Sequence, residues 1–190
     1  MTQTLVDVRQ AITMDAQAIA EIHVASWQSA YAGIMPTSFL TALSTDMRAR
    51  SWREALESGR ISVALAYTAG QLAGWAAYGK CRDADKDASW GEIEAIYLHP
   101  SRYGQGIGTL LMEHACHSLA ELRYTHVSLW VLTNNLRART FYEHAGFAVD
   151  DKTKEFELGG SVLCEIRYQR RIGGSYREMP PSASDCMPVA

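Results

Sequence analysis

The sequence has little of what marks a secreted, membrane-bound or nucleic-acid-binding protein. Its 190 residues carry a net charge of −3, so no overall basic field attracts nucleic acid or an anionic membrane. No apolar run is long enough to cross a bilayer, and the first residues, MTQTLVDVRQ, lack the basic start and apolar core of a signal peptide. These absences predict a cytoplasmic protein with neither a nucleic-acid nor a membrane partner.

Cysteine is also scarce, and its placement excludes two kinds of scaffold. The chain has four cysteines, none in a C-x-x-C pair, and their spacing suits neither a zinc site nor a dense disulfide framework. The scattered histidines offer no third ligand to a metal. We therefore expect reduced thiols and no metal ion. The cysteines are Cys81, Cys116, Cys164 and Cys186.

What the sequence does contain is the composition and patterning of one α/β domain. Hydrophobic residues make up 47% and charged residues 21%, as in ordinary globular proteins. The apolar spacing alternates between helical and strand periods, which predicts the order β-α-α-β-β-β-α-β-α-β-β. Helical crossovers join some strands and tight hairpins join others, so the sheet should be mixed. The expected segments are a strand at 5–9, helical segments within 16–58, strands at 61–69, 72–80 and 91–98, a mobile polar loop at 81–90, a helix at 106–122, a strand at 126–132, a helix at 135–146, and strands at 147–158 and 161–169.

The last stretch of the chain differs in composition from the rest. GGSYREMPPSASDCMPVA is rich in Gly, Pro and Ser and poor in apolar residues. Such a segment cannot bury enough apolar surface to offset the entropy of ordering it. We therefore expect a domain over residues 3–170 and a disordered tail over 171–190.

Three glycines at alternate positions, Gly104, Gly106 and Gly108, lie between an expected strand and an expected helix in SRYGQGIGTLL. Such a turn is an anion site, because unpaired amides at the helix start point outward and the helix dipole favours negative charge. A nucleoside triphosphate loop would need lysine after its last glycine, and a dinucleotide loop would need glycine where Thr109 stands. The sequence disfavours both, and with them nucleotide hydrolysis.

A second motif corroborates the loop and identifies its ligand class. NNLRARTFYEHAGF contains N-x-x-A-x-x-F-Y-x-x-x-G-F from Asn135 to Phe147. Together with PSRYGQGIGTLL, which follows the strand EIEAIYL, it resembles the GNAT superfamily of acyl-CoA-dependent N-acyltransferases, over about residues 3–170. The family loop reads Arg/Gln-x-x-Gly-x-Gly/Ala and holds the pyrophosphate of acyl-CoA. Tyr103 departs from that pattern, because it stands at the Arg/Gln position.

The resemblance implies a fold, a cosubstrate and a binding site. The implied fold is a mixed, mostly antiparallel sheet of about seven strands flanked by helices. The implied cosubstrate is acetyl-CoA, without a metal, held by backbone amides of the strand that splays from its neighbour and by the glycine loop. The implied cofactor-binding residues are Ile96, Tyr97, Leu98, Tyr103, Gly104, Gln105, Gly106, Ile107, Gly108, Thr109 and Asn135.

The implied reaction is direct transfer of the acetyl group to a primary amine in a ternary complex. A base must take a proton from the amine, and the strand offers Glu92 and Glu94, which alternation would place on one face with Ile96 and Leu98. Two neighbouring carboxylates can raise each other's pKa toward neutrality. Glu92 matches the family position of the base and is preferred, with Glu94 as the alternative, and Tyr142 matches the tyrosine that protonates the leaving thiolate.

The acceptor is less defined by the sequence. The first two helices and the closing hairpin would shape its pocket, and they supply six polar or aromatic candidates to which no role is assigned. A small-molecule amine or a peptide or protein amine fits equally, and a homodimer is expected by analogy. A non-catalytic acyl-CoA-binding module is the alternative function. The six candidates are His23, Trp27, Tyr31, Met35, Glu155 and Glu157.

Overall fold

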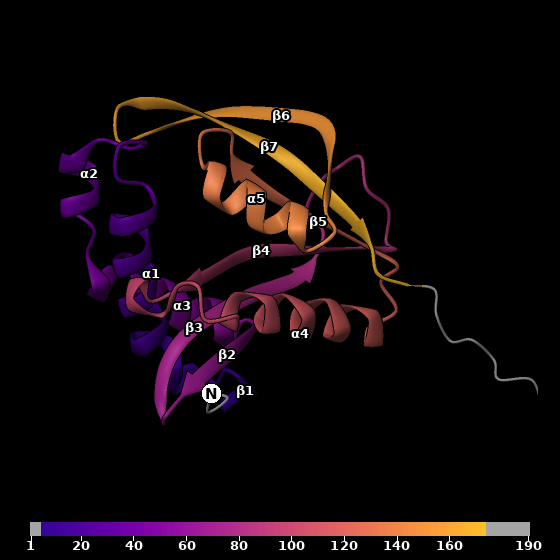
Figure 1. Ribbon diagram of the computed structural model, residues 1–190, viewed down its shortest axis with the longest axis horizontal. Helices are drawn as coiled ribbons and strands as arrows, with labels where there is room; N and C mark the ends of the chain where they lie inside the picture. Colours follow the sequence, from indigo (N-terminus) through magenta and orange to yellow (C-terminus); the bar gives the residue numbers. More distant parts are fainter. Residues whose placement is uncertain (1–4, 174–190) are drawn as a thin grey trace, which may run out of the picture.

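The computed structural model describes residues 5–173, which fold around one mixed sheet (Figure 1). The strand order is β1-β2-β3-β4-β5-β7-β6, and each pairing is antiparallel except that of β4 with β5. The expected mostly antiparallel sheet is therefore confirmed. The strands of this described part are β1 (Val6–Gln10), β2 (Ser62–Thr68), β3 (Gln71–Lys80), β4 (Trp90–Leu98), β5 (His126–Leu132), β6 (Ala148–Leu158) and β7 (Ser161–Arg171).

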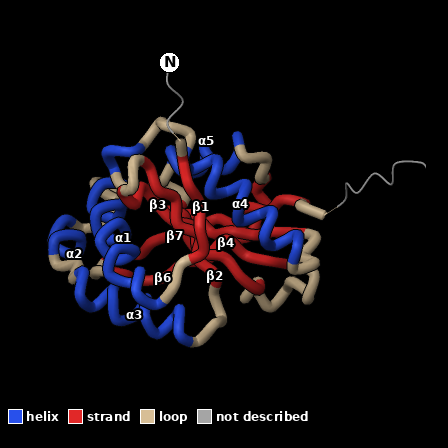
Figure 2. Tube along the Cα trace, turned by 90° about the horizontal axis from the view of Figure 1, so that it is seen from below, coloured by secondary structure: helices blue, strands red, loops and turns tan. Residues whose placement is uncertain are grey.

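Helices cover both faces of the sheet (Figure 2). On one face α1 and α3 bury Ile19 and Trp52 against Trp75, and on the other α4 and α5 bury Leu111 and Tyr142 against β5 and β7. Three helices rather than two separate β1 from β2, because five residues after Pro36 form the short helix α2. That helix is too short for an apolar period to show in the sequence. The helices are α1 (Ala16–Ala30), α2 (Thr37–Thr41), α3 (Thr45–Glu57), α4 (Ile107–Glu121) and α5 (Leu136–His144), with 3-10 turns at Thr13–Asp15 and Pro100–Arg102.

The ordered fold continues past the expected domain boundary. Arg171 still belongs to β7, and the amides of Ile172 and Gly173 both donate to the carbonyl of Thr125. Ordered contacts therefore extend three residues beyond residue 170, to Gly173. The remainder of the expected tail lies outside the described residues. No helix within residues 5–173 is long and apolar enough to cross a membrane.

β4 contains a bulge that changes which of its side chains point to each face of the sheet. The strand pairs with β3 residue for residue from Leu98 back to Ala95, and then the register shifts so that Glu94 has no partner. An extra residue reverses the alternation of the strand. Ile93 and Ile96, three residues apart, consequently pack into the same core beside α4.

The sheet opens between β4 and β5. The two strands pair only where residues 90–92 of β4 meet residues 126–128 of β5, although β4 continues for six more residues. Beyond Glu92 the strands diverge, and one side of the β4 backbone is left without a neighbouring strand. The amide of His99 donates to the carbonyl of Ala73 on the β3 side. Since successive residues of an antiparallel ladder turn their backbone groups to opposite sides, the amides of Ile96 and Leu98 face the gap.

Candidate active site

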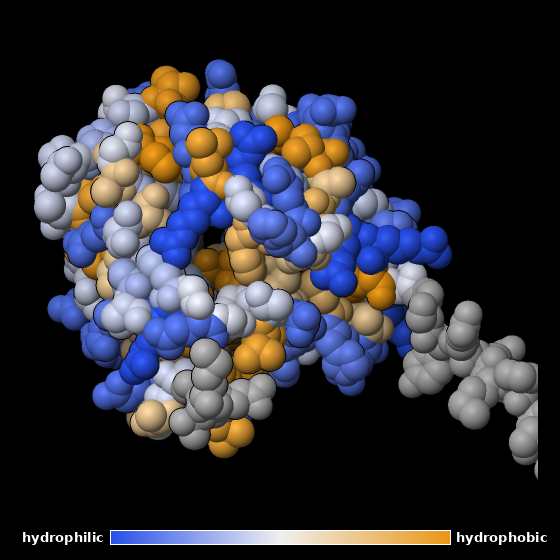
Figure 3. Space-filling model, in the orientation of Figure 1, coloured by the Kyte–Doolittle hydropathy of each residue, from blue (hydrophilic) through white to orange (hydrophobic). Residues whose placement is uncertain are grey.

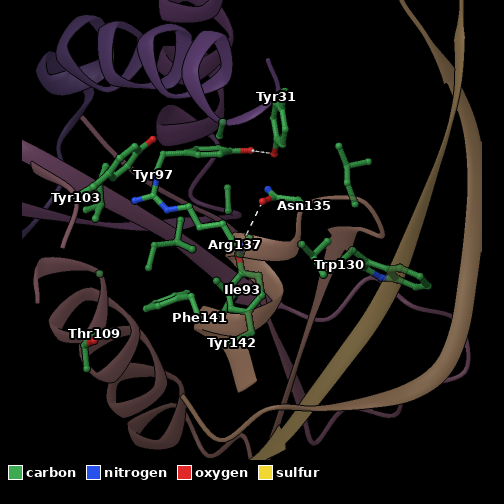
Figure 4. Close-up of a pocket in the computed structure, with 18 of the residues that line it drawn as sticks. Tyr31, Ile93, Tyr97, Tyr103, Thr109, Trp130, Asn135, Arg137, Phe141 and Tyr142 are labelled. Atoms are coloured by element: carbon green, nitrogen blue, oxygen red, sulfur yellow. Dashed lines mark hydrogen bonds between the residues drawn. The ribbon is translucent and has the colours of Figure 1, made fainter. Parts of the chain in front are cut away.

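A cavity of about 370 Å³ occupies this gap and is bordered by α1, β4, the glycine loop, β5, α5 and β7. Figure 3, in the orientation of Figure 1, shows a hollow in the surface of the molecule, and Figure 4 shows the side chains that line the cavity. Segments more than 100 residues apart in the chain, such as Tyr31 and Glu165, meet here. The cavity therefore brings together both motifs found in the sequence.

The glycine loop presents free backbone amides to one end of the cavity. Gly104 and Gly106 have φ angles of +74° and +77°, which a residue with a side chain rarely adopts. Gly106 is also the N-cap of α4, and no side chain of the described residues caps that helix. The first-turn amides are left unpaired and, with the positive end of the helix dipole, can receive an anion.

Most of the expected loop residues line the cavity, but two do not. Gln105 turns back and donates from its Nε2 to the carbonyl of Ser101 at 3.1 Å, and Ile107 is buried in the core. A contribution of these two residues to a ligand can come only from their backbone. The loop residues that line the cavity are Tyr103, Gly104, Gly106, Gly108 and Thr109, and on β4 Ile96, Tyr97 and Leu98 also line it.

Helix α5 places two expected residues at the middle of the cavity. Asn135 is its N-cap, and the Asn135 Oδ1 accepts the amide of Ala138 at 3.2 Å. The Asn135 side-chain NH₂ remains available toward the cavity. Tyr142 follows two turns later, buried, with its ring directed into the cavity (Figure 4). Burial, followed by the nearby Tyr97 and Glu165, raises the pKa of Tyr142 well above its ordinary value, so the phenol stays protonated near neutrality.

The two carboxylates of β4 lie in different surroundings. Glu92 and Glu94 were expected to share a face with Ile96 and Leu98, which is wrong, because the bulge at Glu94 interrupts the alternation. Glu92 lies before the gap opens, is not among the residues that line the cavity, and has a side chain 4% exposed. Glu94 lines the cavity and is 12% exposed.

Arg82 contacts both carboxylates and was not expected from the sequence. Its Nη2 and Nε donate to Glu92 at 2.6 Å and 3.0 Å, and its backbone amide donates to the same carboxylate at 3.1 Å. Its Nη1 lies 3.0 Å from Glu94. Both oxygens of Glu92 are thus hydrogen-bonded to Arg82, whereas Glu94 pairs with Arg82 at one atom and with Arg60 at 4.0 Å. Burial raises the pKa of Glu94, and the charge of Arg82 opposes that rise.

The segment that carries Arg82 is tied down, although it was expected to be a mobile loop. Arg167 of β7, 3% exposed, lies 2.9 Å from Asp83 and 2.7 Å from both Asp85 and Asp150. Trp130 also donates from its Nε1 to Asp83 at 3.1 Å. The sequence had no signal for this cluster, because Arg167 lies about eighty residues beyond the acidic loop.

Aromatic side chains form the wall beside α1. The hydroxyls of Tyr31 and Tyr97 lie 3.1 Å apart, and burial raises the pKa of both (Figure 4). His23 is stacked against Tyr97, with ring centroids 5.3 Å apart, and its Nδ1 accepts the Trp52 Nε1 at 3.0 Å. Burial, followed by the charge of Arg48, lowers the pKa of His23 to about 3.

The acceptor candidates taken from the sequence divide between cavity, core and surface. Tyr31 lines the cavity, and His23 and Met35 are buried. Glu155 and Glu157 are exposed on β6. The carboxylate that β7 brings to the cavity is instead Glu165, which pairs with Lys154 at 3.1 Å. Within residues 5–173 no group of His, Cys, Asp or Glu is arranged to hold a metal ion.

Comparison with known proteins shows which family has this sequence pattern and this fold. The model of the acetyltransferase (GNAT) family matches residues 18–147. The uncharacterized N-acetyltransferase YuaI of Bacillus subtilis strain 168 is 28% identical over 162 residues, which are 85% of this chain and 91% of YuaI. PaiA N-acetyltransferase of Thermoplasma acidophilum, solved in complex with coenzyme A, has the same fold with a TM-score of 0.69 at 19% identity, covering 88% of this chain and 99% of PaiA. YncA of Salmonella typhimurium, solved with its cofactor acetyl-CoA, has a TM-score of 0.67 at 22% identity, covering 94% and 98%.

Proposed function

Since the chain belongs to the acetyltransferase (GNAT) family and is an acetyl-CoA-dependent acyltransferase, we propose that it acetylates a primary amine by direct attack in a ternary complex. One observation carries the proposal. The gap between β4 and β5 joins the free amides of the glycine loop to Glu94 and Tyr142 in one cavity. A site suited to phosphate, a slot suited to an extended arm and two candidate proton-transfer groups therefore border one cavity.

The cavity fits coenzyme A at both the anion site and the gap. The first-turn amides of α4 are positioned to receive the pyrophosphate, and the amides of Ile96 and Leu98 to bond the pantetheine arm and the thioester carbonyl. The NH₂ of Asn135 adds a donor on the opposite side. When bound, acetyl-CoA supplies the acetyl thioester that the amine attacks.

We assign the base to Glu94 rather than to Glu92. Glu94 lines the cavity, and burial raises the pKa of its carboxyl toward the range in which a base works efficiently. Both oxygens of Glu92 are already held by Arg82 outside the cavity. Glu94 takes the proton from the attacking amine, directly or through one water, as the new C–N bond forms.

Tyr142 completes the transfer on the sulfur side. The developing oxyanion of the carbonyl is stabilised by the backbone amide of Leu98 or Ile96, which faces the gap. As the C–S bond breaks, the phenol of Tyr142 donates its proton to the departing thiolate. Burial keeps that phenol protonated until it is needed.

The test follows release of the coenzyme A thiol from acetyl-CoA with a panel of primary amines. We expect turnover with at least one amine, and an initial-rate pattern in which both substrates bind before either product leaves. Glu94→Gln should lower kcat by about 10²-fold, the range of a general base, and Glu92→Gln by much less. Coenzyme A that binds by calorimetry without turnover on any amine would favour a non-catalytic binding module instead. A larger loss from Glu92→Gln, at unchanged stability, would return the base to Glu92.

A further inference from the structure

We propose that Arg137 of α5 binds the pyrophosphate of coenzyme A and supplies the positive charge that Tyr103 removes from the glycine loop. This assignment rests on the proposed function, because it concerns the cosubstrate of the same site. It goes beyond that function by adding a side chain of α5 to a pyrophosphate site that otherwise consists of the glycine loop and the first turn of α4.

The first observation is the contact between the two side chains. The guanidinium carbon of Arg137 lies 3.7 Å from the centroid of the Tyr103 ring. Both residues line the cavity, and Figure 4 shows the Arg137 side chain reaching from α5 toward the glycine loop. A cation stacked on an aromatic face is held in place, while its N–H groups at the edge stay free to donate.

The second observation is that the guanidinium of Arg137 has no polar partner among the described residues. It has neither a hydrogen bond nor an ion pair with any residue of the range 5–173. Its neighbours are engaged elsewhere. Arg102, next to Tyr103, donates to Gln71 on β3 at 3.0 Å and does not line the cavity. Arg139, two residues further along α5, donates to Tyr168 at 3.1 Å and to the Thr133 carbonyl at 3.0 Å.

The third observation is the position of the stack relative to the anion site. Tyr103 directly precedes Gly104, the first of the glycines that present backbone amides, so the cation stands at the edge of that cradle. Backbone amides carry only partial charges, whereas a pyrophosphate carries full negative charge. A guanidinium is suited to phosphate, because its planar fork donates two parallel hydrogen bonds. Tyr103 thus acts as the platform for a cation that comes from α5.

The experiment measures affinity of the full-length chain for coenzyme A and for dephospho-coenzyme A, which lacks the 3′-phosphate but keeps the pyrophosphate. Arg137→Ala should weaken binding of both by about tenfold, as for loss of a charged hydrogen bond at an exposed site. It should raise KM for acetyl-CoA and leave kcat unchanged. Arg102→Gln removes the same charge one residue before Tyr103 and should change affinity less than twofold.

A rescue variant makes the test specific. In the Arg137→Ala background, Tyr103→Arg places the cation back on the loop and should restore most of the affinity. Tyr103→Phe should bind as wild type, because the stack persists, and Tyr103→Leu should bind more weakly.

Three outcomes would overturn the assignment. They are an Arg137→Ala affinity equal to wild type, an equal loss from Arg102→Gln, and a loss that disappears with dephospho-coenzyme A, which would place Arg137 on the 3′-phosphate. If wild type itself binds no coenzyme A, it is the proposed function that fails.

Discussion

The two ends of the cavity are built from different groups. At the glycine-loop end the groups proposed to bind coenzyme A are mainly backbone amides of α4 and β4, with the side chain of Arg137 beside them. At the carboxylate end the cavity is lined by the side chains of Glu94 and Glu165, and Glu94 pairs with Arg82, whose loop is fixed by Arg167 of β7. The first end depends on the local course of the chain, and the second on the packing of the whole sheet. Variants should therefore disturb one end without the other.

The largest effect should come from Arg167, which fixes the loop that carries Arg82. Arg167→Ala leaves Asp83 and Asp85 without this cation and Asp150 with Lys86 alone, and it should lower the free energy of unfolding by about 3 kcal/mol. Denaturant unfolding measures this, with the exposed Arg171→Ala as the matched control. The folded variant should still bind coenzyme A, so a parallel loss of that affinity would show that the two ends are not independent.

Tyr142 lies between the two ends and should affect chemistry but not binding. Tyr142→Phe should reduce kcat by about 10²-fold, the usual contribution of a general acid, while the affinity for coenzyme A stays within twofold. Steady-state kinetics and calorimetry check this, with Tyr124→Phe as a control, since Tyr124 packs against the core away from the cavity. An unchanged kcat would remove Tyr142 from the mechanism.

His23 should make the aromatic wall sensitive to acid. Its pKa is lowered to about 3 in the folded chain, so the unfolded chain binds more protons between that value and about 6.5. Its contribution to stability is complete above pH 6.5 and is lost as the pH falls, by about 2 kcal/mol at pH 5. The stability difference between pH 7 and pH 5 should shrink in His23→Gln but not in His117→Gln, where the side chain is 74% exposed. Equal slopes in both variants would contradict the buried neutral imidazole.

The smallest effect concerns the charge beside the proposed base. Arg82 opposes the rise of the Glu94 pKa, so Arg82→Gln should raise that pKa further. The acid limb of kcat/KM, measured with one amine throughout, should move to higher pH. Arg60→Gln should move it less, because Arg60 lies 4.0 Å from Glu94 and Arg82 lies 3.0 Å from it. A shift to lower pH would mean that the limb reports another group.

Much of the fold and of the glycine-loop end could be predicted from the sequence. The strand at His126–Leu132 and the helices beginning near Ile107 and Leu136 lie where the periodicity indicated, because each is long and strongly patterned. The Ala69-Gly70 hairpin joins β2 to β3 as expected, with both residues at positive φ. The expected order has two helices between β1 and β2 and the fold has three, because the five residues that follow Pro36 hold too little pattern to be counted as a separate helix.

The carboxylate end could not be predicted to the same extent. Strand alternation assigned the wrong face to the β4 carboxylates, because a one-residue bulge has no signature in a single sequence. The sequence predicts a mobile polar loop at residues 81–90. The structure fixes this segment through Arg167 on β7, a partner too far along the chain for a local pattern to indicate. In the sequence Tyr103 is only a departure from the family pattern, and the fold shows that the guanidinium of Arg137 stacks on its ring.

The sequence by itself determined the order of elements, the free amides before α4 and the motif that carries Tyr142. Those features follow from residues close together in the chain, whose effects on backbone conformation are local. The tertiary structure alone decided which carboxylate reaches the cavity and which cation stacks on Tyr103. Those outcomes depend on strand register and on ion pairs between residues up to 84 positions apart, which form only when the whole sheet is assembled.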